Sequence, residues 1–396
     1  MESSVSGSSS PDGFPDMEPI EVDEVVVAVY RAPVSRPVRT SFGTMRDRPA
    51  VLVRVRDPEG VIGYGEAWCN FPAPAADYRA AIIGEVLAPQ VVGRPWPDPK
   101  AVFDHLSAGT RTVSVQAGER GPFSQAIAGI DIALWDMAAR RAGQPLRRYL
   151  GGAGSRRVPV YASGIGPEDA LVHSLEARAA GHRAFKLKVG FGRDVDLANL
   201  ASLRQGLGGD TVIAVDANQA WSVEEAVRNC RDLAAYSPVW LEEPIGADRA
   251  ADDWRLVAES SAIPLAAGEN VYGARGFDQV IGRGAVAVVQ PDVAKWGGIS
   301  GCLPIARRVI AARRRYCPHY LGGGAGLLAS AHLLAAVGGD GLLEVDSNPN
   351  PLREGLAQPF PALADGHLLL SDVPGLGVEP GDEVAELMTR RVVTAR

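Results

Sequence analysis

From about residue 157 onward the sequence repeats one pattern: a short apolar run ends in polar residues, and a helical stretch follows. Strands that alternate with helices in this way predict a parallel sheet. Eight runs carry the pattern: 158–162, 184–188, 212–216, 239–242, 264–267, 286–290, 315–318 and 342–345. Eight consecutive strand–helix units predict a (β/α)8 barrel, an α/β fold.

A polar residue suited to chemistry stands at or just after the end of seven of these runs. These residues are Lys188, Asp216, Glu242, Glu269, Asp292, His319 and Glu344, spaced 23 to 28 residues apart. A barrel gathers such side chains at the carboxyl-terminal mouth of its strands. An open doubly wound sheet is the alternative topology. It fits less well, because no Gly-x-Gly-x-x-Gly follows the first run.

The residues before the barrel follow other patterns. Residues 1–19 are rich in Ser, Gly, Pro and acid and lack the apolar core of a signal peptide, which predicts a disordered leader with Met17 as an alternative start. Residues 20–150 predict an α+β unit. Its expected strands are 25–30, 50–55 and 61–65, and its clearest expected helix is 126–142. The barrel is expected over 151–360.

Composition excludes several classes of protein. Of the 396 residues, 46% are hydrophobic and 22% charged, as in an ordinary soluble globular protein. The net charge of −7 argues against nucleic-acid binding. No apolar run approaches the roughly 18 residues of a membrane span. The four scattered cysteines predict reduced thiols in a cytoplasmic protein, without a disulfide framework or zinc knuckle.

Lysine is rare here, with four lysines among 40 basic residues. Lys186 and Lys188 nevertheless stand two positions apart on one predicted strand, so both side chains point into the barrel. Two ammonium groups that close lower each other's affinity for a proton, which suits one of them to act as a general base. The alternative, an exposed pair, conflicts with the apolar run around them.

Three acids from successive strands, Asp216, Glu242 and Glu269, would repel one another unless a cation lies between them. Carboxylate oxygens favour Mg²⁺ over zinc. Gln290 and Lys295 are predicted to support these ligands from behind, and Asn218 to lie beside the metal and the substrate. The sequence therefore predicts a magnesium site.

The next two strands carry Asp292 and His319. An aspartate can hold one imidazole nitrogen and leave the other free to act as a base. Glu344 has two open interpretations, a protonated contact to a substrate carboxylate or an ion pair with an arginine. Bases on both sides of a divalent cation predict abstraction of a proton alpha to a carboxylate, with the metal stabilising an enediolate.

Ordered motifs extend over nearly the whole chain after residue 20. They are 63–66 (GYGE), 129–136 (GIDIALWD), 186–188 (KLK), 215–218 (VDAN), 241–244 (LEEP), 267–269 (AGE), 290–292 (QPD), 297–298 (GG), 318–319 (PH) and 374–377 (PGLG). Together they resemble the enolase superfamily and, within it, the mandelate racemase-like subgroup. The muconate-lactonising subgroup is disfavoured, because it would carry a lysine where Asp292 stands.

The resemblance implies an N-terminal capping domain completed by the tail 361–396. It implies Mg²⁺ ligation by Asp216, Glu242 and Glu269. It also implies a base at Lys188, with Lys186 beside the substrate carboxylate, and a base or acid at His319 on the other face. Loops at 37–49 and 66–74 should close over the mouth. Their candidate substrate contacts are Arg46, Arg48, Trp68, Asn70 and Phe71.

The stretch 343–348 and the loop after His319 are similar to those of sugar-acid dehydratases and galactarolactone cycloisomerases. We therefore expect one of these reactions on a small carboxylate, in a homo-oligomer. A racemase or epimerase of a 2-hydroxy acid or an amino acid derivative is an alternative. Two other hypotheses remain: a phosphate-binding barrel, suggested by the glycines at 322–326, and a catalytically silent barrel that acts as a binding protein.

Overall fold

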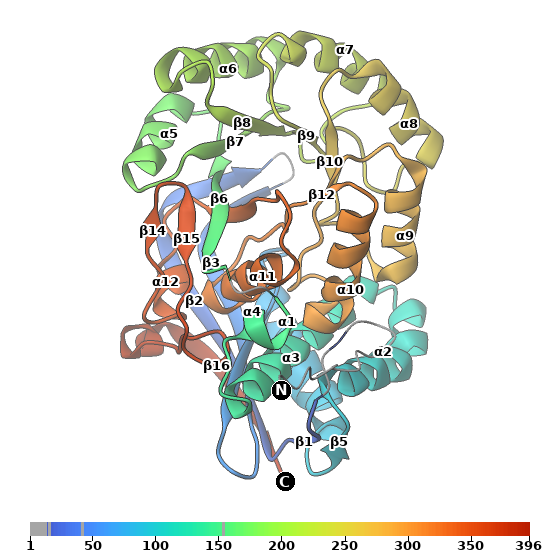
Figure 1. Cartoon of the computed structure of the whole chain (residues 1–396), viewed down its shortest axis with the longest axis vertical. Helices are drawn as coiled ribbons and strands as arrows, with labels where there is room; N and C mark the ends of the chain where they lie inside the picture. Colours follow the sequence, from blue (N-terminus) through green and yellow to red (C-terminus); the bar gives the residue numbers. More distant parts are fainter. Residues whose placement is uncertain (1–13, 15–16, 41–42, 153–154) are drawn as a thin grey trace, which may run out of the picture.

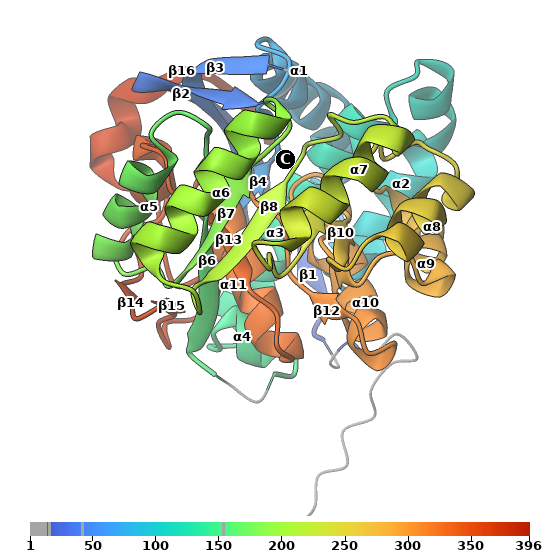
Figure 2. The ribbon, with the colours of Figure 1, turned by 90° about the horizontal axis from the view of Figure 1, so that it is seen from above.

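The computed structural model describes residues 14, 17–40, 43–152 and 155–396. It confirms the predicted class, a (β/α)8 barrel joined to an α+β unit (Figure 1, and Figure 2 from above). The barrel strands are β6 (Arg157–Ile165), β7 (Ala184–Lys188), β8 (Val212–Asp216), β9 (Leu241–Glu242), β10 (Leu265–Ala267), β11 (Val288–Val289), β12 (Arg315–Tyr316) and β13 (Leu343–Asp346). They pair in parallel from β6 in sequence to β12, and β13 pairs with β6. The remaining seam, between β12 and β13, is joined by a bond from Glu344 N to Pro318 O at 3.4 Å.

One helix follows each strand and lies outside the barrel. These helices are α5 (Ala170–Ala179), α6 (Arg193–Leu207), α7 (Val223–Ala234), α8 (Ala251–Ser260), α9 (Gly273–Arg283), α10 (Gly298–Ala311), α11 (Gly324–Val337) and α12 (Pro351–Gly355). In Figure 1, α5 to α9 form an arc around the strands. This alternation explains the repeating pattern in the sequence, because each unit buries one apolar strand beneath a helix.

Side chains inside the barrel are arranged in layers. A small apolar cluster fills the interior: Tyr161, Ala184, Ala214, Trp240, Ala266, Val288 and Cys317. Two positions further along their strands stand polar residues, namely Ser163, Lys186, Asp216, Glu242, Gln290 and His319. Because strand side chains repeat with a period of two, these residues face the same interior one layer closer to the mouth. The apolar layer therefore forms the floor of a polar site.

The N-terminal unit contains a four-stranded antiparallel sheet in the order β16-β2-β3-β4. Its strands are β2 (Glu24–Thr40), β3 (Gly43–Arg56), β4 (Ile62–Ala67) and β16 (Met388–Ala395). Thus the end of the tail forms an edge strand of this unit, which we call the cap. An earlier part of the tail, β14 (Leu363–Ala364) and β15 (His367–Leu369), extends the barrel sheet beside β6.

The helices of the cap include α1 (Ala75–Ala81), α2 (Pro99–Gln116), α3 (Arg120–Arg141) and the short α4 (Leu146–Tyr149), and β1 (Ile20–Glu21) pairs with β5 (Pro95–Trp96). Helix α3 starts six residues before the predicted helix, and it packs against both β4 and α10. Glycines allow the close contact with β4: a Cβ at Gly63 would lie 2.1 Å from Ala133 O, and one at Gly65 would lie 2.2 Å from Gly129 O.

The segment expected as a loop at 37–49 lies mostly in the paired strands β2 and β3, with Val38 opposite Met45. That prediction was wrong because hydrogen bonding across the hairpin continues beyond its Val-rich stem. Of the expected leader, residues 1–13, 15 and 16 lie outside the described residues. Phe14 is buried and stacks on Trp135 with ring centroids 5.3 Å apart. No helix in the described ranges is long and apolar enough to cross a bilayer.

A buried carboxylate joins the cap to the barrel. Asp131 Oδ2 in α3 accepts a hydrogen bond from Ser300 N at 3.0 Å in the first turn of α10. Burial raises the pKa of Asp131 to about 7, while hydrogen bonds from Ser300 oppose the rise. The folded chain therefore binds this proton more tightly than the unfolded chain does. Stability is lost as the pH rises from the ordinary aspartate pKa toward 7.

Asp131→Asn should weaken this pH dependence, because the amide keeps an acceptor oxygen but cannot ionise. Between pH 4 and pH 8 the variant should gain up to about 4 kcal/mol relative to the parent chain. Thermal denaturation of both proteins across this range measures the difference. Equal losses of Tm in the two chains would contradict the assignment.

Candidate active site

Lys186 lies at the centre of the polar layer and is fully buried. Its Nζ donates to both oxygens of Glu242, each at 2.8 Å, and lies 2.8 Å from Glu344 Oε1 and 3.5 Å from Asp216 Oδ2. Burial opposes the charge, but the carboxylates of Glu242 and Glu344 outweigh it and raise the pKa of Lys186 well above its ordinary value. Lys186 is therefore a fixed cation.

Lys188 lies one layer closer to the mouth, on the same side of β7. Its Nζ donates to Asp216 Oδ2 at 2.6 Å and to Asn218 Oδ1 at 2.7 Å. We expected the two lysines to lower each other's pKa. Burial and Lys186 do act in that direction, but the carboxylates of Asp216, Glu242 and Glu344 together outweigh them and raise the pKa of Lys188. In this arrangement Lys188 carries its proton.

The third predicted metal ligand, Glu269, follows β10. Its Oε2 accepts from Lys295 Nζ at 2.8 Å, and the same ammonium donates to Asn270 Oδ1 at 2.9 Å. Burial opposes the ionisation of Glu269, but His319 and Lys295 outweigh it and lower the pKa of this carboxyl. Lys295 therefore supports Glu269 directly.

The register of the strands places Asp216 opposite Glu242. Gln290 Nε2 donates to Glu242 Oε2 at 2.7 Å, so the predicted support from Gln290 is present in the structure. Asn218 adopts a φ of +43°, a left-handed conformation that Asn tolerates, and its N donates to Asp216 Oδ1 at 2.8 Å. These contacts fix the orientation of two of the three acids.

His319 and Asp292 form the predicted pair. His319 Nδ1 lies 2.7 Å from Asp292 Oδ2, while Nε2 faces the site, 3.3 Å from Glu269 Oε2 and 3.7 Å from Glu344 Oε2. Burial opposes protonation, but the surrounding carboxylates raise the pKa of His319 to about 9. The imidazole is therefore a cation near neutral pH, which suits a proton donor better than a base.

Glu344 differs from both of its predicted interpretations. It is not protonated, because Lys186, His319 and Lys188 together overcome the effect of burial and lower the pKa of Glu344 to about 2. Its ion pair is with Lys186 rather than with an arginine. It also accepts hydrogen bonds from Ser163 Oγ and from Tyr320 N. Glu344 therefore holds Lys186 in place from the opposite side to Glu242.

Two members of the site were missed in the sequence. Ser163 lies two residues before the end of β6, the one barrel strand without a predicted active residue, and its position in the register could have revealed it. Asn270 bridges Lys295 and Glu243, with Nδ2 3.0 and 2.9 Å from the two carboxylate oxygens of Glu243. Its position directly after Glu269 was the available signal.

Segments of the cap contact the ends of the barrel strands. Trp68 N donates to Ala294 O at 3.1 Å, and its ring lies 4.8 Å from Lys295 Nζ. Asn70 Nδ2 donates to Leu321 O at 2.7 Å. Trp68 and Asn70 are therefore close to the mouth, as a role in substrate contact requires.

Other cap residues serve as anchors. Glu66 accepts from Gly323 N and Gly326 N, at 2.5 and 3.0 Å, at the start of α11. Arg48 is buried and pairs with Asp346, whereas Arg46 is exposed on β3. The structure thus gives Arg48 a structural contact and leaves the predicted substrate contact of Arg46 without support.

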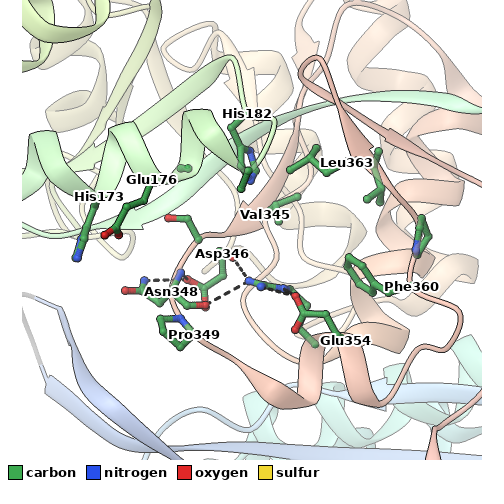
Figure 3. Close-up of a pocket in the computed structure, with 16 residues that line it drawn as sticks. His173, Glu176, His182, Val345, Asp346, Asn348, Pro349, Glu354, Phe360 and Leu363 are labelled. Carbon is green, nitrogen blue, oxygen red and sulfur yellow. Dashed lines mark hydrogen bonds and ion pairs between the residues drawn. The ribbon is translucent and has the colours of Figure 1, made fainter.

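Asp346, at the end of β13, lines an outer cavity of about 520 Å³ (Figure 3). His182, Asn348 and Phe360 are among its other lining residues, and Arg353, which also lines it, donates a hydrogen bond to Asp346 O. Burial lowers the pKa of His182 to about 4, so that side chain is neutral there. None of the predicted catalytic or metal-binding residues lines this cavity, so it is separate from the site inside the barrel.

The charges of the site fit a divalent cation. Five largely buried carboxylates, those of Asp216, Glu242, Glu269, Asp292 and Glu344, face three ammonium groups and the His319 imidazolium. Among the described residues, no three acidic or histidine side chains converge closely enough to surround an ion. Instead, each predicted metal ligand is paired with a lysine ammonium: Glu242 with Lys186, Asp216 with Lys188 and Glu269 with Lys295. The excess of negative charge and the oxygen donors nevertheless suit Mg²⁺.

Two family models match the chain. The N-terminal domain of mandelate racemase / muconate lactonizing enzyme matches residues 23–151, and the enolase C-terminal domain-like family matches residues 170–384. Magnesium is the metal of this superfamily. D-galactarolactone cycloisomerase from Agrobacterium fabrum is 32% identical, with 84% of this chain and 89% of the relative covered.

Two solved structures share the fold over nearly their whole length. A mandelate racemase/muconate lactonizing enzyme from Bordetella bronchiseptica is 49% identical with a TM-score of 0.86, covering 93% of this chain and 99% of the other. L-talarate/galactarate dehydratase from Salmonella typhimurium, liganded with Mg and L-lyxarohydroxamate, is 26% identical with a TM-score of 0.85, covering 100% and 99%. This chain therefore belongs to the mandelate racemase / muconate lactonizing enzyme family of the enolase superfamily.

Proposed function

We propose that this protein is a Mg²⁺-dependent sugar-acid dehydratase or sugar-acid lactone cycloisomerase. Lys188 removes the proton alpha to the substrate carboxylate, and His319 acts on the opposite face. The observation that carries the proposal is the pairing of two proton carriers with a cluster of acids. Lys188 forms an ion pair with Asp216 at one side of the cluster, and His319 Nε2 faces Glu269 at the other side.

Asp216, Glu242 and Glu269 would hold the metal. Bound Mg²⁺ supplies a Lewis acid that stabilises negative charge on the substrate carboxylate. Lys186, held between Glu242 and Glu344, is the fixed cation available to that carboxylate. With Asp216 engaged by a metal, Lys188 would lose the strongest of the carboxylate influences that raise its pKa, while burial and Lys186 would continue to lower it. Lys188 can then accept a proton.

Dehydration follows from these positions. Lys188 Nζ takes the α-proton, the hydroxyl on the β-carbon leaves with the proton from His319 Nε2 as water, and the resulting enol becomes a 2-keto acid. Asp292 holds His319 Nδ1 and directs Nε2 toward the site. Asp292 also stabilises the protonated imidazole, from which His319 can donate this proton; in the racemase alternative a neutral imidazole removes a proton instead. In a cycloisomerase the leaving group is the lactone oxygen.

Turnover of a library of sugar acids and their lactones, with Mg²⁺, tests this proposal. A 2-keto acid formed with loss of water supports dehydration, and opening of a lactone to an isomeric 2-keto acid supports cycloisomerisation. A change in configuration at the α-carbon, with no loss of water and no lactone rearrangement, would replace the proposal with the racemase alternative. If no acid is changed under any condition, the silent binding protein becomes the better account.

His319→Asn should lower kcat by about 10²- to 10⁴-fold, because general acid catalysis contributes that much. Asparagine can still accept or donate a hydrogen bond at Asp292, so the fold should be retained. The measurement is kcat on the substrate found in the library, with circular dichroism as a check of folding. Retention of more than half of the activity would remove His319 from the mechanism.

We also propose that the protein acts as a homo-oligomer in a reducing compartment such as the cytoplasm. All four cysteines are buried free thiols, which supports reducing conditions. The oligomer is supported by the general tendency of soluble enzymes to form symmetric assemblies. Light scattering after size-exclusion chromatography measures the mass in solution, and a monomer mass would contradict the oligomer.

A further inference from the structure

A second cavity, of about 470 Å³, opens between the cap helices α2 and α3 and the barrel. On the barrel side it is lined by the start of α9 and by the segment before α10, through residues such as Gly273 and Trp296. This cavity lies outside the set of residues that carry the proposed function, and the inference below does not depend on that function.

The lining of this cavity is strongly basic. Arg111 from α2, Arg120 from the start of α3 and Arg275 from α9 contribute guanidinium groups, and none of the described residues that line it is acidic. Within the described ranges, none of these three guanidinium groups makes an ion pair. Three uncompensated positive charges around one hollow, in a chain of net charge −7, point to a negatively charged occupant.

Some surface arginines elsewhere are neutralised by a neighbouring acid. Arg308 pairs with Asp278 and Arg315 with Asp340, so an acid from a neighbouring element neutralises each. The outer cavity of Figure 3 likewise places Glu354 beside Arg353. The gathering of three such arginines around one hollow, with no acidic residue among its described lining, distinguishes the cavity at α2, α3 and α9.

Hydrogen-bond donors add to the charge. The first residue of α9, Gly273, lines the cavity, and its N-cap residue Tyr272 makes no side-chain cap bond. The first amides of this eleven-residue helix are thus uncapped by a side chain, and the helix dipole favours an anion there. Ser107 and Ser124 contribute hydroxyls. Guanidinium forks, hydroxyls and helix amides are the donors that phosphate oxygens use.

Aromatic rings form part of the wall. Phe103, Phe123, Tyr272 and Trp296 line the cavity, and Trp296 packs on Phe277 with ring centroids 5.4 Å apart. Apolar wall and polar anchors together are typical of small-molecule sites. An occupant with an apolar or aromatic part beside its charged group would use both.

We propose that this cavity binds a small organic phosphate. A phosphate monoester is the class that matches the lining best, because its dianion can use several guanidinium groups at once while its organic part contacts the rings. Carboxylates share part of this chemistry, so the test must separate the two kinds of anion.

Phenyl phosphate is the probe, and its binding to the magnesium-loaded protein is measured by isothermal titration calorimetry. Phthalate, with two carboxylates on the same ring, is the carboxylate arm, and phenol is the neutral arm. We expect phenyl phosphate to bind with one site per chain, phthalate to bind more weakly and phenol to give no signal. Tighter binding of phthalate would overturn the assignment to phosphate.

The double variant Arg111→Gln/Arg275→Gln should weaken binding of phenyl phosphate at least tenfold, because it removes two charge-assisted contacts. The matched control is Arg178→Gln/Arg228→Gln, which removes two exposed arginines from α5 and α7. The control should bind as the parent chain does. No binding by the parent chain, an unchanged affinity in the first variant, or an equal loss in both variants would overturn the proposal.

Discussion

Replacing Lys188 by methionine should lower kcat by about 10²- to 10⁴-fold and leave the chain folded. Methionine fills most of the same volume but cannot accept the α-proton. Lys188 Nζ also forms an ion pair with Asp216 Oδ2 at 2.6 Å, so the loss of this ammonium frees one carboxylate oxygen for the metal. The affinity for Mg²⁺ should therefore rise or stay unchanged while turnover collapses. Steady-state kinetics and a magnesium titration measure the two effects separately.

Lys100→Met is the matched control, because Lys100 pairs with Asp104 on α2 and belongs to no part of the proposed site. Its kinetics should equal those of the parent chain. If Lys188→Met kept most of the parent activity, the base would have to be another group. If the variant lost magnesium binding together with activity, the ion pair between Lys188 and Asp216 would be needed to keep the metal ligands in place.

The second large effect is expected from Glu242→Gln. Glu242 accepts from Lys186 and from Gln290, and it lies opposite Asp216 in the strand register. Glutamine preserves the shape but removes the charge at the centre of the proposed metal ligands. The affinity for Mg²⁺ should fall by more than about 100-fold, since even residues behind metal ligands change affinity by up to that factor. Activity at low magnesium should be lost.

Isothermal titration with Mg²⁺ measures this loss. Glu259→Gln, at an exposed position of α8, is the control and should bind as the parent chain does. A Glu242→Gln variant that binds Mg²⁺ with parental affinity would show that the metal is held elsewhere. A variant that unfolds is recognised by circular dichroism, and Asp216→Asn then provides the same test from the neighbouring strand.

Much of the barrel could be predicted because the polar residues of the site recur at the end of each apolar run. The strands β7 and β8 have the predicted bounds, and their last residues, Lys188 and Asp216, lie opposite each other. The strands β9 and β11 are shorter than the apolar runs that predicted them. Their flanking residues still contribute to the ladder, as in the bond from Val239 N to Ile213 O at 2.8 Å. Apolar runs thus predict where a strand lies, but not the residue at which its hydrogen-bonded pairing ends.

The protonation states could not be predicted in the same way. The ionised state of Glu344 depends on Lys186, which reaches it from another strand, and a sequence pattern carries no distance between the two. The raised pKa of Lys188 has the same origin, because two lysines seen together on one strand suggest repulsion, while the acids that outweigh it come from β8 and β9. Spacing predicts which residues meet, but the balance of charges among them requires the geometry.

The partners that cap residues contact on the barrel also could not be predicted from the sequence. Asn70 was predicted near the mouth, and it bonds the loop after β12. Arg48, considered for substrate contact, instead pairs with Asp346 at the end of β13. Both residues lie on cap segments directed at the barrel, and nothing in the order of their neighbours distinguishes an anchoring arginine from a substrate-binding one.

Exchange of the α-proton with solvent tests the central claim most directly. The magnesium-loaded protein is incubated in D₂O with the acid found in the library, and the α-position is followed by nuclear magnetic resonance. We predict that the His319→Asn variant, whose Lys188 is intact, incorporates deuterium at the α-carbon without completing turnover. The Lys188→Met variant should incorporate none. Equal exchange in both variants, or exchange without magnesium, would contradict proton abstraction by Lys188 at a metal-dependent site.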